Sequence, residues 1–122
     1  MNSIAVLMST YNGEKYLCEQ LDSIFAQKNV KLHLFVRDDG STDLTPDILT
    51  QYSKRYSNMT VDFAENIGVG NSFMTLLYSV PGEFDFYSFA DQDDIWEEDK
   101  LYSAQQLLME TKNNLYVSNQ EC

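Results

Sequence analysis

Hydrophobic residues along this 122-residue chain fall into two alternating kinds of segment. Short, continuous apolar runs are typical of strands that are buried on both faces, as in parallel sheets. Longer segments with apolar residues three or four positions apart are typical of helices that pack one side against a core. Because the two kinds take turns from the first residues to the last, the pattern predicts an α/β fold with a mainly parallel sheet.

The boundaries of the expected elements follow from the same pattern. We expect strands at 4–8, 31–38, 59–65, 84–90 and 114–119, and helices at 14–27, 71–79 and 97–112. A further helix should start at a cap supplied by Thr42 or Asp43, with Pro46 in its first turn, and continue to about Tyr56. Polar or glycine-rich segments follow the first four strands: STYNGE, RDDGSTD, ENIGVG and ADQDD. In a parallel sheet these segments share the edge where ligands bind.

The acidic segment ADQDD directly follows an aromatic strand. Asp91 and Asp93 are two residues apart, so in extended backbone both carboxylates point the same way. Carboxylate oxygens are ligands that Mg²⁺ and Mn²⁺ prefer. We interpret the pair as a metal site; the alternative is a solvated acidic turn that caps the helix beginning near Glu97.

The segment RDDGSTD ends the second expected strand with two neighbouring carboxylates. Asp38 and Asp39 point to opposite sides of the strand, so at most one of them faces a ligand. A carboxylate here can accept hydrogen bonds from a ribose or a base N–H; the alternative is ordinary turn chemistry. Tyr11, in STYNGE, suits either stacking on a nucleobase or core packing. ENIGVG lacks the spacing of a dinucleotide fingerprint and argues against a Rossmann dehydrogenase.

The composition argues against several classes of function. The net charge of -11 argues against a nucleic-acid partner, and it favours a divalent cation if a diphosphate ligand binds. A single histidine and two cysteines, Cys18 and Cys122, argue against zinc, histidine catalysis and a disulfide framework. No apolar run is long enough to cross a bilayer, and MNSIAVLMSTYN lacks the features of a secretory signal. A cytoplasmic location is therefore expected.

Four motifs taken together resemble a known family. VLMSTYNGEKYL, RDDGSTD, ENIGVGNSF and ADQDDIWEEDKL occur in the order and spacing of family-2 glycosyltransferases. The chain is most similar to bacterial members that carry DQDDIW, including rhamnosyltransferase-like enzymes that build surface polysaccharides. The resemblance extends over residues 4–119.

This resemblance implies a GT-A fold, a Rossmann-like three-layer arrangement in which a nucleotide-diphospho-sugar lies over the carboxyl ends of the strands. Carried over by motif, the base and ribose are surrounded by Ser9, Tyr11 and Glu14, and Asp39 contacts the base. Asn66 and Gly68 shape the loop near the sugar donor, and Asp91 lies near the ribose or sugar. Asp93, with Asp91, ligates the Mg²⁺ or Mn²⁺ that bridges the diphosphate.

The expected chemistry is inverting transfer of a sugar to a hydroxyl of a saccharide or lipid-linked saccharide, which allows peripheral contact with the inner face of the membrane. The helix after the glycine loop lacks the arginine that many members carry there. Since family domains are longer, we expect residues 1–122 to be a truncated, sugar-donor-binding part, with the general base beyond Cys122. An uncovered edge at the fifth strand predicts self-association. The alternatives are a non-catalytic nucleotide- or metal-binding module, or a remnant acting through a partner.

Overall fold

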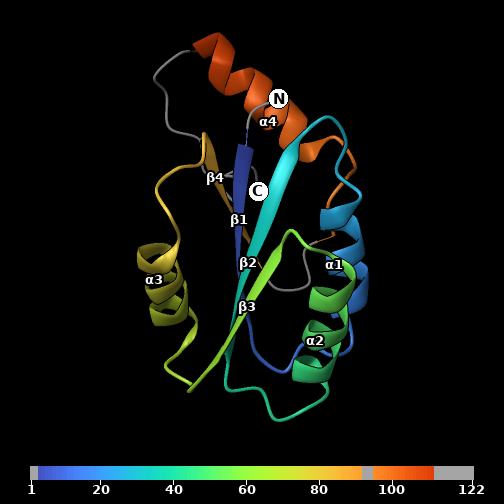
Figure 1. The fold of residues 1–122 in the computed structure, drawn as a ribbon, viewed down its shortest axis with the longest axis vertical. Coiled ribbons are helices and arrows are strands. Elements are labelled where there is room, and N and C mark those ends of the chain that lie inside the picture. Colours follow the sequence, from blue (N-terminus) through green and yellow to red (C-terminus); the bar gives the residue numbers. More distant parts are fainter. Residues whose placement is uncertain (1–2, 92–94, 112–122) are drawn as a thin grey trace.

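A computed structural model describes residues 3–91 and 95–111 of the chain, with side chains of the last helix described to Leu107. Strands and helices alternate strictly along these residues (Figure 1). In chain order they are β1 (Ser3–Thr10), α1 (Leu17–Phe25), β2 (Lys31–Asp39), α2 (Thr45–Arg55), β3 (Met59–Ala64), α3 (Val69–Ser79), β4 (Phe86–Ala90) and α4 (Lys100–Thr111). The strand expected at 114–119 lies outside the described residues.

The described strands form one sheet in the order β3-β2-β1-β4, and every pairing is parallel. The prediction of a parallel α/β sheet is therefore confirmed. The chain moves outward from β1 to β2 and β3, and then returns to place β4 on the other side of β1. Ligands of open α/β sheets bind beyond the carboxyl ends of the strands, near such a reversal.

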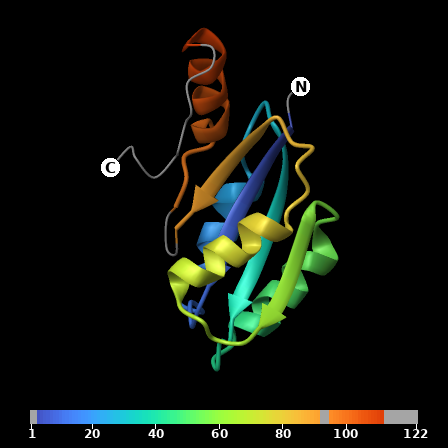
Figure 2. The same cartoon turned by 90° about the vertical axis from the view of Figure 1, so that its left-hand side faces the viewer.

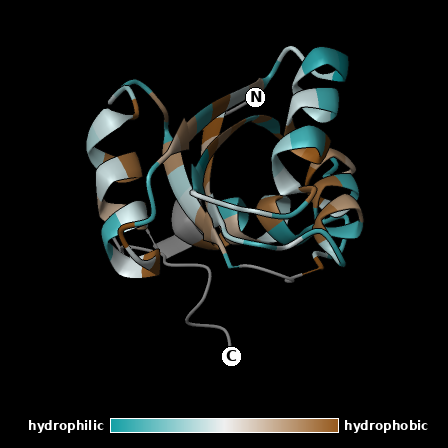
Figure 3. Ribbon diagram, turned by 90° about the horizontal axis from the view of Figure 1, so that it is seen from below, coloured by the Kyte–Doolittle hydropathy of each residue, from teal (hydrophilic) through white to brown (hydrophobic). Residues whose placement is uncertain are grey.

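Helices cover both faces of the sheet and make three layers. Helix α3 lies on one face, while α1 and α2 lie on the other (Figures 1 and 2). Alternate residues of β1 serve the two sides: Val6 and Met8 belong to the larger core, and Ala5 and Leu7 pack with Leu76 of α3. Figure 3 looks onto the lower edge and shows hydrophobic stretches along the strands between the helix layers. A strand that is buried on both faces explains the uninterrupted apolar run near the start of the chain.

Several helix boundaries differ from the sequence prediction. Helix α1 begins at Leu17 rather than residue 14, because a tighter turn comes first, in which the Gly13 carbonyl accepts the Tyr16 N–H at 3.2 Å. Helix α4 begins at Lys100 rather than 97, and α3 begins at Val69, within the glycine loop. The predicted cap for α2 is wrong. Its N-cap is Leu44, whose own side chain makes no capping hydrogen bond, although Asp43 Oδ1 accepts the Thr45 N–H at 2.9 Å and Pro46 does lie in the first turn.

Two polar side chains of α1, and that of Gln27 two residues beyond its end, hold the segment that follows β4. The Gln20 amide donates to the Asp91 carbonyl, the Ser23 hydroxyl accepts the Trp96 N–H at 3.0 Å, and the Gln27 carbonyl accepts the Leu101 N–H at 2.9 Å. Gln20 and Ser23 are three residues apart and so lie along one side of the helix, and Gln27 follows just after its end at Phe25. Helix α1 therefore anchors the chain on both sides of residues 92–94.

Cys18 lies exposed on α1 with a free thiol, and Cys122 lies outside the described residues. Across residues 3–91 and 95–111, no helix combines the length and the apolar character needed to span a membrane.

Candidate functional site

A pocket of about 340 Å³ opens at the carboxyl edge of the sheet. Its walls come from the end of β1, the end of β2 and the loop between β3 and α3. The lining residues are Ser9, Thr10, Tyr11, Asp39, Asn66, Gly68 and Val69. A larger hollow of about 610 Å³ lies at the opposite, amino edge and includes His33 and Phe84. Because ligands of parallel sheets bind at the carboxyl edge, the smaller pocket is the stronger candidate.

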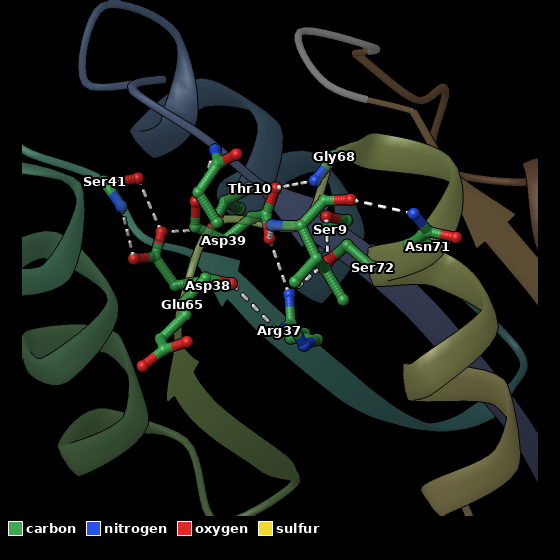
Figure 4. A network of polar contacts seen from close by, with 12 residues as sticks. Ser9, Thr10, Arg37, Asp38, Asp39, Ser41, Glu65, Gly68, Asn71 and Ser72 are labelled. Atoms are coloured by element: carbon green, nitrogen blue, oxygen red, sulfur yellow. Dashed lines mark hydrogen bonds and ion pairs between the residues drawn. The ribbon is translucent and has the colours of Figure 1, made fainter.

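The Asp39 carboxylate is the most constrained group in this pocket (Figure 4). Its Oδ1 accepts hydrogen bonds from Arg37 Nη1 at 2.7 Å and from the Ile67 N–H at 2.9 Å. Its Oδ2 accepts one from the Gly68 N–H at 3.1 Å. Burial acts to raise the pKa of Asp39, but these hydrogen bonds and the Arg37 charge outweigh it and lower the pKa. Asp39 is therefore an ionised acceptor in the pocket wall.

Arg37 is a residue of this site that the sequence reasoning missed. Its side chain is buried, and besides Asp39 it donates to the Ser72 hydroxyl at 3.0 Å and the Glu65 carbonyl at 3.1 Å. The Ser72 hydroxyl also lies 2.6 Å from the Ser9 hydroxyl. A signal was present in the sequence, because Arg37 and Asp39 are two residues apart on one strand and so share a side.

Asp38 points away from the pocket, as expected from its place beside Asp39. Its Oδ1 accepts hydrogen bonds from the hydroxyls of Thr10 and Ser41, both at 2.7 Å, and its Oδ2 accepts the Ser41 N–H at 3.1 Å. These contacts pin the end of β1 to the turn after β2. Asp38 therefore stabilises the turn after β2, and Asp39 is the carboxylate of the pair that remains available to a ligand.

The segments STYNGE and RDDGSTD bind each other. The pairs are the Asn12 N–H with the Ser41 hydroxyl, the Thr42 N–H with Asn12 Oδ1, and the Glu14 N–H with Asp43 Oδ2. The Gly13 N–H also donates to the hydroxyl of Thr45, the first residue of α2. The Glu14 carboxylate accepts the Leu44 N–H at 3.4 Å, and Glu14 is exposed and absent from the pocket wall. Among the candidates from the first motif, the pocket gathers Ser9 and Tyr11 but not Glu14.

Gly40 and Gly68 allow the loops to meet at the pocket. Both have positive φ, +75° at Gly40 and +91° at Gly68, where a side chain is unfavourable. A Cβ on Gly40 would lie 2.9 Å from the backbone nitrogen of Asn66. The Asn66 amide group in turn donates to the Asp39 carbonyl at 3.1 Å. The turn after β2 and the loop after β3 therefore touch through backbone atoms.

Of the candidate metal ligands, the structure describes Asp91, and Asp93 lies outside the described residues. Asp91 is exposed directly after β4, and its carboxylate is of the type that binds Mg²⁺ or Mn²⁺. It is not part of the wall of the 340 Å³ pocket. Within residues 3–91 and 95–111 there is no group of three or more histidine, cysteine or acidic residues arranged to hold a metal.

Residues 5–121 match the model of the family described as Glycosyl transferase family 2. The chain belongs to this family. The match includes each of the motifs at the carboxyl edge and all the described strands and helices except the first two residues of β1.

Curated relatives agree with this assignment. The dTDP-rhamnosyl transferase RfbG of Shigella flexneri is 38% identical over 117 residues, a match that covers 92% of this chain and 40% of RfbG. The putative teichuronic acid biosynthesis glycosyltransferase TuaG of Bacillus subtilis is 32% identical over 108 residues, covering 88% of this chain and 42% of TuaG. The chain thus spans less than half the length of these relatives.

Solved structures resemble the fold. TarS of S. aureus, residues 1–349 in complex with UDP, superimposes with a TM-score of 0.77 at 32% identity, covering 88% of this chain and 32% of that one. The mannosyltransferase PcManGT from Pyrobaculum calidifontis, in complex with GDP-Man and Mn²⁺, gives a TM-score of 0.74 at 28% identity, covering 86% of this chain and 32% of that one. The predicted GT-A fold is confirmed by these glycosyltransferase structures and the parallel sheet.

Proposed function

We propose that this chain supplies the sugar-donor site of an inverting glycosyltransferase. The enzyme transfers a sugar from a nucleotide-diphosphate donor to a hydroxyl acceptor in the synthesis of a cell-surface polysaccharide. One observation carries the proposal: an ionised, tightly held Asp39 lies in the wall of a pocket at the carboxyl edge of a family-2 sheet. The relatives RfbG and TuaG, and the UDP complex of TarS, support this substrate class.

In this proposal the nucleotide lies against the residues that line the pocket. Tyr11 is 45% exposed at the rim, which leaves its ring free to stack on a base. Asp39 accepts a base N–H, since its carboxylate has four acceptor positions and three are occupied within the described residues. Ser9, Asn66 and Gly68 shape the remaining walls. Glu14, by contrast, stabilises the loop before α2 through the Leu44 N–H.

The proposed metal ligands are Asp91 and Asp93. Asp91 follows β4, the strand next to β1, so it emerges at the same edge as the pocket. A bound Mg²⁺ or Mn²⁺ would neutralise the diphosphate leaving group and complete its coordination with phosphate oxygens. Gln20 holds the Asp91 backbone and so fixes where this residue leaves the strand. The Mn²⁺ in the PcManGT complex supports the choice of metal.

The proposal assigns residues 1–122 to binding of the sugar donor and leaves the acceptor to residues of a longer catalytic domain. No residue of the described part is assigned as the general base. The acceptor is a saccharide or a lipid-linked saccharide, and the site of action is cytoplasmic, at the inner face of the membrane for a lipid-linked acceptor. Self-association of the chain through a sheet edge is a further part of the proposal; light scattering over a range of concentrations tests it, and a constant monomer mass would contradict it.

Calorimetry tests the central claim. We expect UDP or dTDP to bind the chain more tightly with Mn²⁺ than without it, and Asp93→Ala to abolish the metal-dependent gain. Asp62→Ala, which removes an exposed carboxylate from β3, is the matched control and should leave binding unchanged. If a folded sample shows no metal-dependent binding of either nucleotide, the proposed function is wrong.

A further inference from the structure

We infer that Arg37 is a positioning residue of the sugar-donor site and fixes the Asp39 carboxylate in the orientation that meets the nucleotide base. The inference rests on the proposed function and adds a residue that the family resemblance does not assign. The helix after the glycine loop lacks an arginine, and the structure brings the Arg37 guanidinium from β2 to within 3.0 Å of the Ser72 hydroxyl on that helix.

The position of the Arg37 guanidinium is fixed by three elements. It shares one side of β2 with Asp39, and its Nη1 lies 2.7 Å from Asp39 Oδ1. The same nitrogen donates to Ser72 of α3 at 3.0 Å, while Nη2 donates to the Glu65 carbonyl after β3 at 3.1 Å. Arg37 is only 5% exposed, so its side chain has little room to change rotamer. A guanidinium held in this way holds its carboxylate partner in turn.

Stability alone is a poor explanation for this ion pair. The Arg37 and Asp39 side chains are 6% and 3% exposed, and taking both charges out of water costs free energy that their attraction does not generally exceed. Within the part of the chain that the structure describes, Arg37 Nε is buried and has no hydrogen-bond partner. A site selected for stability would favour apolar side chains of similar volume here. A role in the neighbouring pocket accounts for the pair better.

Arg37 preserves the acceptor character of Asp39. A carboxylate that is 2% exposed tends to take up a proton, and a base lying over it would remove still more water. A protonated carboxyl would lose an acceptor position that the base needs. The adjacent guanidinium opposes protonation by charge and by a hydrogen bond.

Arg37 also determines which oxygen faces the ligand. Among the described residues, Arg37 and the Ile67 N–H both occupy Oδ1, whereas the Gly68 N–H alone occupies Oδ2. The free acceptor position therefore belongs to Oδ2. The Ser72 hydroxyl links the guanidinium to Ser9, a residue of the pocket wall, so the same network also holds the end of β1 (Figure 4).

Three variants test the inference: Arg37→Met, Arg37→Lys and the control Arg55→Met, which removes an exposed arginine from α2. The first measurement is the ¹³C NMR titration of the Asp39 carboxyl without nucleotide. In Arg37→Met we expect its midpoint to rise by roughly one to three pH units, because the opposite charge is lost. Arg37→Lys keeps the positive charge but loses the forked N–H donors of the guanidinium. The titration midpoint of Asp39 should therefore stay near that of the unaltered chain. Arg55→Met should not change it.

The second measurement is the affinity for UDP and dTDP at pH 7 with Mn²⁺. Both Arg37 variants should bind roughly tenfold or more weakly, since a charge-assisted hydrogen bond that orients the carboxylate is lost. Arg55→Met should bind like the unaltered chain. Weaker binding by Arg37→Lys, with an unchanged titration midpoint, separates orientation from charge.

The outcomes are distinct from those that test the proposed function. If the unaltered chain binds no nucleotide, the proposed function fails, and the NMR titration still decides whether Arg37 controls Asp39. If the unaltered chain binds and the folded Arg37 variants bind equally well, the inference is overturned. An unshifted midpoint in Arg37→Met overturns it as well. If Arg37→Met does not fold, Arg37→Lys decides alone: affinity equal to that of the unaltered chain refutes the positioning role.

Discussion

Three glycine-to-alanine substitutions in loops separate two energetic costs of an added side chain. One is the cost of a backbone with positive φ, and the other is the cost of a steric contact. At Gly40 the added Cβ meets both a positive φ and the Asn66 nitrogen at 2.9 Å. At Gly68 it meets a positive φ of +91° but no atom of the described residues within 4 Å. At Gly82 the described part of the chain places no atom within 4 Å, and the backbone is not in the left-handed region. The series therefore measures the conformational cost with and without the steric contact, and provides its own control.

The expected magnitudes follow from these differences. The left-handed conformation costs an L-residue about 1–2 kcal/mol, and an uncommon region such as that of Gly68 costs about 1–3 kcal/mol. Forcing the Asn66 backbone away from Gly40 adds about 1–3 kcal/mol. Because alanine lowers the conformational entropy of the unfolded chain, each variant also gains about 0.4–1 kcal/mol of stability. We expect Gly40→Ala to lose roughly 3 kcal/mol, Gly68→Ala roughly 1 kcal/mol, and Gly82→Ala to change little or gain stability slightly.

Urea denaturation followed by circular dichroism measures these free energies of unfolding, and the slope against urea should be equal across the series. A different slope would mean that a variant had altered the unfolded or native ensemble. The reasoning is refuted if Gly40→Ala is no less stable than Gly68→Ala, because the contact with Asn66 would then cost nothing. It is also refuted if Gly82→Ala is as destabilised as the other two.

Three further predictions concern stability. Ser88→Ala should be neutral or stabilising by up to about 1 kcal/mol in thermal unfolding, because the buried hydroxyl has no partner within the described residues; a clear loss would contradict this. Burial acts to raise the pKa values of Asp39 and Asp43, but hydrogen bonds lower both. Their stabilisation is therefore complete above the ordinary pKa of about 3.9 and is lost as the pH falls through the folded values. Asp43→Asn should reduce the acid-induced loss in urea titrations between roughly pH 5 and pH 2, and an unchanged loss would count against it. Gln27→Met should cost about 1–3 kcal/mol and accelerate hydrogen exchange at the Leu101 amide, where unaltered exchange would refute the contact.

The fold was largely predictable from the sequence, because it depends on a periodic pattern. A strand buried on both faces needs consecutive apolar residues, as Ala5, Val6 and Leu7 provide, and a parallel neighbour needs a helical crossover. The strand order was not predicted, since it depends on which edges meet and not on the pattern of any one strand. Helix starts also differed, as at Leu17, because the preceding turn depends on contacts with a loop distant in sequence.

The site was predictable as a group of strand ends, and less so residue by residue. Ser9, Tyr11 and Asp39 were expected together and do line one pocket. Glu14 was expected beside them, but its carboxylate faces the Leu44 amide across the loop, a contact that only the folded chain creates. Arg37 was missed because a charged residue in a strand suggests a solvent-facing position. Its burial depends on α3 packing over β2, which no local pattern reveals.

The polar residues of α1, together with Gln27 just after its end, have a consequence for the order in which the chain folds. Gln20, Ser23 and Gln27 find their backbone partners 71, 73 and 74 residues further on. During synthesis the helix emerges long before those partners exist, and two of these side chains, Gln20 and Gln27, are buried in the finished protein. Closing so long a loop is slow, and an amide enclosed before its partner arrives costs free energy. The first helix is therefore among the last elements to reach its final packing, so folding of this domain is completed only once its fourth strand and the segment after it have been synthesised.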